Sequence, residues 1–144
     1  MDNQQTIILK SFNKRFLQAL LQLKEFLPNF LPIILLIGGV EFCIEQGNPE
    51  LPLILFRMAI YPVKDMIYEE NEKILDPDFL QEKIKTTMEE MRKIKLIDVK
   101  VGIPKLKQNV LDGRQAWDNF STDKKKNFWN DLKIITKLSE KIRI

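Results

Sequence analysis

Histidine is absent from this chain of 144 residues, cysteine occurs once, and glycine occurs only 5 times. Without histidine, the chain cannot build Ser-His-Asp or Cys-His nucleophile systems, histidine-containing zinc sites, or the usual general base near neutral pH. The single thiol, Cys43, excludes an internal disulfide and every multi-cysteine zinc site, and fits a reducing compartment. We therefore expect a protein that is not an enzyme and that carries no metal and no cofactor.

The few glycines do not form a phosphate-binding loop. Gly38-Gly39 lacks a third glycine and a preceding strand, and the pattern G-x-x-x-x-G-K does not occur. Cys43 lies in an apolar helical segment without a basic neighbour in sequence, which favours a small buried side chain over a nucleophile. Nucleotide chemistry and thiol chemistry are therefore not indicated.

Two pairs of carboxylates have spacings that occur in functional sites. Glu41 and Glu45 share one helix face, but a metal or acid–base role would need partners from other helices, so we favour a solvated helix edge. Asp76 and Asp78 flank Pro77 and lack the glycine and downstream pattern of a calcium loop. Helix capping explains the second pair better.

The longest uncharged run extends from residue 26 to residue 40. As a helix it spans roughly 22 Å, against a hydrocarbon core of about 30 Å, and two prolines and a Gly-Gly pair weaken it further. The polar N-terminus lacks the basic start and apolar stretch of a signal peptide, so we expect a protein that is not secreted. We interpret residues 26–40 as a buried helix, with a membrane-contacting hairpin as the less favoured alternative.

Charge is distributed unevenly along the chain. Residues 1–72 carry 6 basic and 9 acidic side chains, whereas residues 73–144 carry 17 basic and 11 acidic ones, which gives −3 and +6. Such asymmetry can indicate a C-terminal surface for an anionic partner. It is weaker than the concentrated lysine and arginine of dedicated nucleic-acid domains.

The spacing of prolines and polar patches predicts an all-α fold. Between these breaks, apolar residues recur every three or four positions, and no internal repeat or Gly/Ser linker occurs. We expect one domain over residues 1–144, with a flexible N-terminus at 1–5 and a connector at 95–105. The domain is predicted to be a compact bundle of about five to six helices. The expected helices cover residues 6–27, 29–46, 48–68, 77–94, 106–120 and 122–142.

Local signals fix the expected helix ends. Asn48-Pro49-Glu50 and Asp76-Pro77-Asp78 each combine a capping residue, a proline and an acid, which is typical of a helix start. Asn29 and Ser121 are further candidate N-caps, and Gly47 can supply a left-handed terminus. Pro62 predicts a kink or break in the third helix, because it removes a backbone donor.

One basic patch has aromatic neighbours: Lys124-Lys125-Lys126 precedes Phe128-Trp129. Cations beside aromatic rings can contact phosphates and bases. The alternative, which we favour, is a solvated lysine face with its aromatic residues in the core.

Several segments of the chain resemble a family of small, uncharacterised helical proteins of the nucleocytoplasmic large DNA viruses, the giant viruses of algae and protists. The segments are Phe12-Asn13-x-x-Phe16 with Leu20, Leu23 and Phe26-Leu27-Pro28, then Asn48-Pro49, Tyr61, Lys64 to Glu72, Phe79, Phe128-Trp129-Asn130-Asp131-Leu132 and Leu138-Ser139-Glu140-Lys141-Ile142. The resemblance implies a viral origin and a helical fold, but no activity.

These observations predict a non-enzymatic viral interaction protein, a virion structural or assembly component of the minor capsid type, in the virion or in the host cytoplasm (the viral factory) during assembly. Its expected partners are larger viral proteins, and oligomerisation is left open. The alternative is an accessory factor in viral transcription, replication or genome packaging that contacts nucleic acid through the basic C-terminal half. Candidate partner-binding residues are Lys124, Lys125, Lys126, Trp129, Phe30 and Ile33. Other apolar residues expected near the surface are Leu31, Ile34, Leu53 and Phe56.

Overall fold

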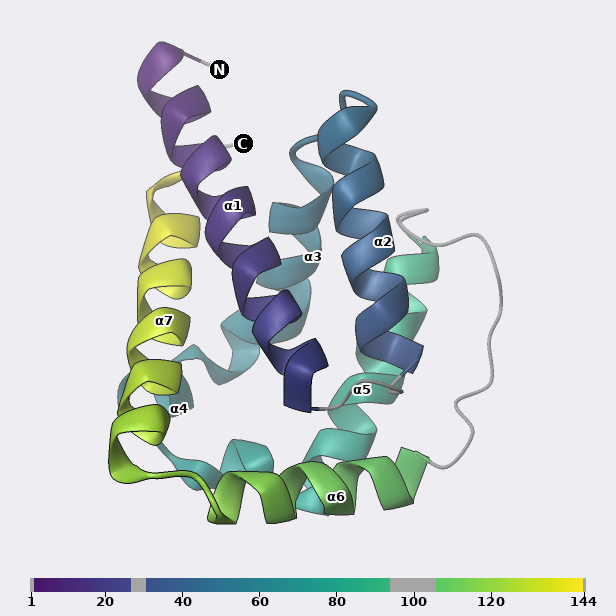
Figure 1. Cartoon of the computed structure of the whole chain (residues 1–144). Helices are drawn as coiled ribbons and strands as arrows, with labels where there is room; N and C mark the ends of the chain where they lie inside the picture. Colours follow the sequence, from purple (N-terminus) through teal and green to yellow (C-terminus); the bar gives the residue numbers. More distant parts are fainter. Residues whose placement is uncertain (1, 27–30, 94–105, 144) are drawn as a thin grey trace.

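The computed structural model of the chain describes residues 2–26, 31–93 and 106–143, and the regular structure in those ranges is entirely helical (Figure 1). The predicted all-α class is therefore confirmed. The elements are α1 (Asn3–Phe26), α2 (Leu31–Glu45), α3 (Leu51–Ile60), the 3-10 helix η1 (Tyr61–Val63), α4 (Lys64–Tyr68), the 3-10 helix η2 (Glu72–Leu75), α5 (Pro77–Lys93), α6 (Leu106–Asp118) and α7 (Thr122–Lys141). The predicted connector at 95–105 and the candidate cap Asn29 lie outside the described residues.

Helix α1 lies between two neighbouring helices of the bundle. It packs against α7 on one side and α2 on the other, and these two neighbours both run opposite to α1 (Figure 1). Helix α3 lies behind α1, α5 packs on α3, and α6 crosses one end of the bundle below the other helices. As a result, α2 and α7 lie on opposite sides of the molecule and run in the same direction.

The end of α2 agrees with the predicted glycine terminus. Gly47 adopts a left-handed conformation with φ of 83°, and the Asn48 N–H donates to the Cys43 carbonyl at 2.9 Å. This pair of features forms a Schellman motif, which only glycine enters without steric cost.

The start of α3 differs from the prediction. The helix begins at Leu51 and not at Asn48-Pro49, and its N-cap, Glu50, makes no capping bond through its side chain. A turn over residues 49–50 follows the Schellman motif, so Pro52 and not Pro49 occupies the first helical turn.

A kink at Pro62 is not confirmed either. Helix α3 ends at Ile60, and the chain passes through the 3-10 turn η1 into α4, a separate helix of 5 residues. Proline fits the first positions of such a turn because no carbonyl there requires its missing N–H. Pro62 therefore marks a break between two helices and not a kink within one.

Two other predicted starts hold. Helix α5 begins at Pro77, and the Ser121 side chain accepts a hydrogen bond of 3.1 Å from the Lys124 N–H at the start of α7. At the N-terminus, helical structure begins at Asn3, within the stretch expected to be flexible. Gln5 ties this end to the end of α7, because its side chain donates to the Lys141 carbonyl and accepts from the Arg143 N–H.

Two clusters of buried side chains occupy opposite halves of the bundle. We call the first the α1/α3/α7 cluster; its buried members are Leu9, Phe12, Leu53, Phe56, Ile135 and Ile142. We call the second the tryptophan cluster; its buried members are Ile67, Ile74, Trp117 and Trp129. Helix α7 contributes to both clusters, and smaller groups join α2 to α1, α3 and α5.

Candidate interaction site

The predicted lysine patch lies at the first turn of α7. Lys124 and Lys126 are exposed, and Lys125 is half-buried. The Lys125 ammonium lies 5.5 Å from the centre of the Trp117 ring, and the Lys124 ammonium lies 5.4 Å from that of Phe120. The rings attract cations that the positive end of the α7 dipole would otherwise repel.

The aromatic side chains beneath these lysines belong to the core. Trp129 is only 4% exposed and makes an edge-to-face contact with Trp117, with ring centres 5.9 Å apart. The Trp117 indole N–H donates to the Glu72 carboxylate at 2.6 Å. Trp129 therefore supports the patch from inside the fold and is not presented to a partner or to a base.

The residues predicted to form an apolar surface differ in their burial. Phe30 lies outside the described residues. Ile33 is half-buried against Leu20 and Val40. Leu53 and Phe56, which we expected near the surface, are fully buried in the α1/α3/α7 cluster, so that expectation was wrong.

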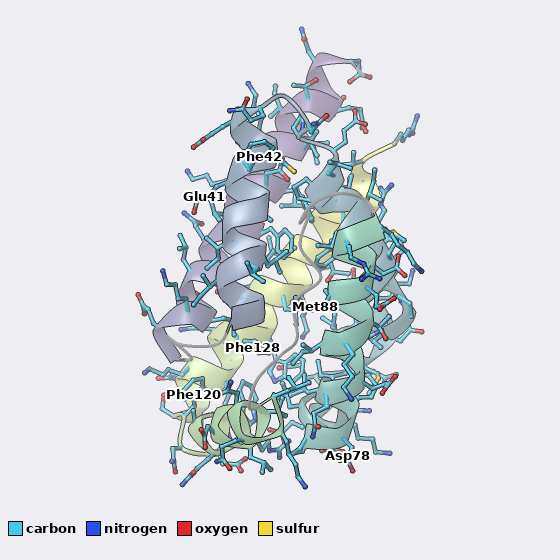
Figure 2. All side chains as sticks on the ribbon, turned by 90° about the vertical axis from the view of Figure 1, so that its right-hand side faces the viewer. Glu41, Phe42, Asp78, Met88, Phe120 and Phe128 are labelled. Carbon is cyan, nitrogen blue, oxygen red and sulfur yellow. The ribbon has the colours of Figure 1, made fainter. Side chains whose placement is uncertain are left out.

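The outward face of α2 carries exposed apolar side chains. Phe42 is 60% exposed and Ile34 is 39% exposed, one helical turn on either side of Gly38. Glu41 and Glu45 lie on the same face, and neither forms an ion pair with another described residue. Figure 2 looks at this side and shows Glu41 and Phe42 on the upper half of α2. We call Ile34, Gly38, Glu41, Phe42 and Glu45 the α2 face.

A second face was missed by the sequence reasoning. On α7, the exposed residues Ile134, Lys137 and Lys141 follow one another at helical spacing on the side turned away from the core, and we call them the α7 face. Ile134 is 37% exposed. Ile134 lies outside the apolar stripe of residues 128, 132, 135, 138 and 142, and this position could have predicted the α7 face from the sequence.

Two ionisable side chains among the described residues have raised pKa values. Burial raises the pKa of the Cys43 thiol, so the nucleophilic thiolate is disfavoured. Burial, together with a hydrogen bond of 3.2 Å that its hydroxyl donates to Glu140, raises the pKa of Tyr68 to about 12. Among the described residues, no group of three or more cysteine, aspartate or glutamate side chains could hold a metal ion.

A small depression lies between α1 and α7. It is lined by Arg15, Gln18, Gln22 and Asp131, and its volume is about 80 Å³. Sites for small ligands usually measure roughly 300–1,000 Å³. It can hold a few water molecules, but not a metabolite.

None of the described helices combines the length and the apolar character needed to cross a lipid bilayer. No protein-family model, curated protein or solved structure matches the chain.

Proposed function

We propose that the protein is a non-enzymatic interaction protein that docks on larger proteins through the α2 face. One observation carries the proposal: Ile34 and Phe42 are exposed on the outside of α2, beside carboxylates that have no ionic partner among the described residues. A helix that met only water would carry polar side chains there. Exposed apolar side chains that cluster on one face favour a protein partner.

The resemblance to proteins of giant viruses supports a viral origin. On this basis we propose that the protein is a virion structural or assembly component of the minor capsid type, which meets its partners in the viral factory and stays in the particle. Apolar anchors with charged neighbours suit such docking, because buried aromatic and aliphatic side chains give affinity and charges give orientation.

Quantitative mass spectrometry of purified particles against infected-cell lysate tests the proposal. We expect the wild-type protein to be enriched in particles, and the variant Glu41→Lys/Glu45→Lys to be depleted at least about tenfold, because reversed charges repel the partner. The control variant Glu69→Lys/Glu82→Lys alters two exposed carboxylates elsewhere by the same charge and should stay enriched. A wild-type protein that is absent from particles would contradict the proposal.

A second candidate function, contact with nucleic acid, is favoured by the exposed lysines of α7. Because Trp129 is buried, such contact would be to phosphates, without base stacking. It predicts that affinity for a DNA duplex, measured by fluorescence anisotropy, falls steeply between about 50 and 200 mM salt. It also predicts that the affinity of Lys124→Glu/Lys126→Glu for the duplex depends less steeply on salt concentration. Negligible binding at low salt would remove this candidate.

A further inference from the structure

We infer that the α2 face binds the α7 face of a second copy of this chain, so that copies associate head to tail. The inference depends on the proposed function in one respect: both treat the α2 face as a docking surface. Helices α2 and α7 lie on opposite sides of α1 and run in the same direction (Figure 1), and the residues of the two faces are exposed on those helices. Placing one copy beside another by a simple shift therefore brings α7 of one against α2 of the next, with the two helices parallel.

The two faces carry opposite charges. The α2 face presents Glu41 and Glu45, and the α7 face presents Lys137 and Lys141. All four side chains are exposed, and none forms an ion pair with another residue in the described ranges. Complementary charges of this kind steer association and fix its register.

The spacing of the two faces also matches. Glu41 and Glu45 follow Gly38 by three and seven residues, and Lys137 and Lys141 follow Ile134 by the same steps. With parallel helices and Ile134 level with Gly38, each lysine therefore comes level with a glutamate. In an antiparallel arrangement with Ile134 still level with Gly38, Glu41 would come level with Asp131. Two carboxylates at that position would repel each other.

Gly38 gives the apolar contact its shape. A Cβ atom added at Gly38 would have no neighbour within 4 Å, so the surface there is open. The exposed side chain of Ile134 can enter this space, with Ile34 one turn before it and Phe42 one turn after it. A small residue in one helix opposite a larger one in the next allows close packing.

A contact between two different faces does not close on itself as a two-fold dimer does. It forms rows or rings, because a pair of copies still has one free α2 face and one free α7 face. One helix face against another is smaller than the interface of roughly 1,600 Å² in a typical stable complex. The association is therefore weak, dependent on concentration and weakened by salt.

Sedimentation velocity of the full chain over a range of concentrations tests the inference. We expect the sedimentation coefficient of the wild type to rise with concentration at low salt but not at high salt. Glu41→Lys/Glu45→Lys and Lys137→Glu/Lys141→Glu should each weaken association at least about tenfold, because each variant presents two faces of like charge. Circular dichroism verifies that both variants fold.

Mixing the two variants is the decisive measurement. In an equimolar mixture, each reversed face meets its complement on the other variant, so association should return to near the wild-type level. Loss of folding in either variant would not produce this recovery. The control Glu69→Lys/Glu82→Lys should associate like the wild type.

The inference is overturned if the wild type stays monomeric at low salt, or if the mixture does not recover. A mixture that stays monomeric while Lys137→Glu/Lys141→Glu loses binding to a DNA duplex assigns the α7 face to nucleic acid. The inference and the proposed function can fail independently. If Glu41→Lys/Glu45→Lys is depleted from particles but the wild type is monomeric in solution, only the inference is overturned. If the mixture of variants associates but the wild type is not enriched in particles, only the proposed function is overturned.

Discussion

At the scale of single residues, Arg57 of α3 controls the end of α7. Its guanidinium donates hydrogen bonds to the carbonyls of Ser139 and Ile142, at the last turn of α7 and at its C-cap. Carbonyls at a helix end have no partner within the helix, and the negative end of the helix dipole favours a cation. Because Ser139 is fully buried, water cannot replace the guanidinium there.

We predict that Arg57→Met lowers the free energy of unfolding by about 2–3 kcal/mol, because it removes charged hydrogen bonds and leaves a buried carbonyl unpaired. Arg57→Lys should recover part of the loss, since lysine keeps the charge but lacks the planar guanidinium whose Nη2 donates to both carbonyls. Urea denaturation followed by circular dichroism measures both. Arg143→Met, which changes an exposed arginine near the same helix end, should cost less than about 0.5 kcal/mol. Equal losses in the two methionine variants would show that Arg57 has no special role.

At the scale of elements, the sequence predicted helix ends best where one residue determines the backbone. Pro77, Ser121 and Gly47 act locally, through a missing N–H, a side-chain acceptor and access to positive φ, and each marks an end in the structure. The start of α3 was misplaced because two nearby prolines, Pro49 and Pro52, both suit a first turn. The turn that follows α2 determines which of the two prolines lies in the first turn of α3.

The outward faces were harder to predict, because burial depends on neighbouring helices. Helices α2 and α3 are apolar on most sides, so their periodicity does not separate Ile34, which is exposed, from Leu53, which is buried. The lysine patch was correctly placed at the start of α7, but the burial of Trp129 required the packing of α6. The α7 face depends on the same tertiary information.

At the scale of the whole molecule, the two clusters of buried side chains are joined by shared helices. Helix α7 carries Trp129 in one cluster and Ile135 in the other, and Ile60, at the end of α3, packs against both. Both tryptophans of the chain lie in the tryptophan cluster. Tryptophan fluorescence therefore reports on one half of the bundle, whereas circular dichroism reports on all of its helices.

We predict that the two halves unfold together. Leu53→Ala in the α1/α3/α7 cluster should destabilise the protein by about 2–5 kcal/mol, because a fully buried leucine leaves a cavity when it is truncated. If the halves are coupled through α7, the urea midpoints from tryptophan fluorescence and from circular dichroism shift by the same amount. Met58→Ala, which shortens an exposed side chain of the same helix, should change both midpoints little. A fluorescence midpoint that stays at the wild-type value while the circular dichroism transition splits would show that each half folds independently, and that α7 only links them.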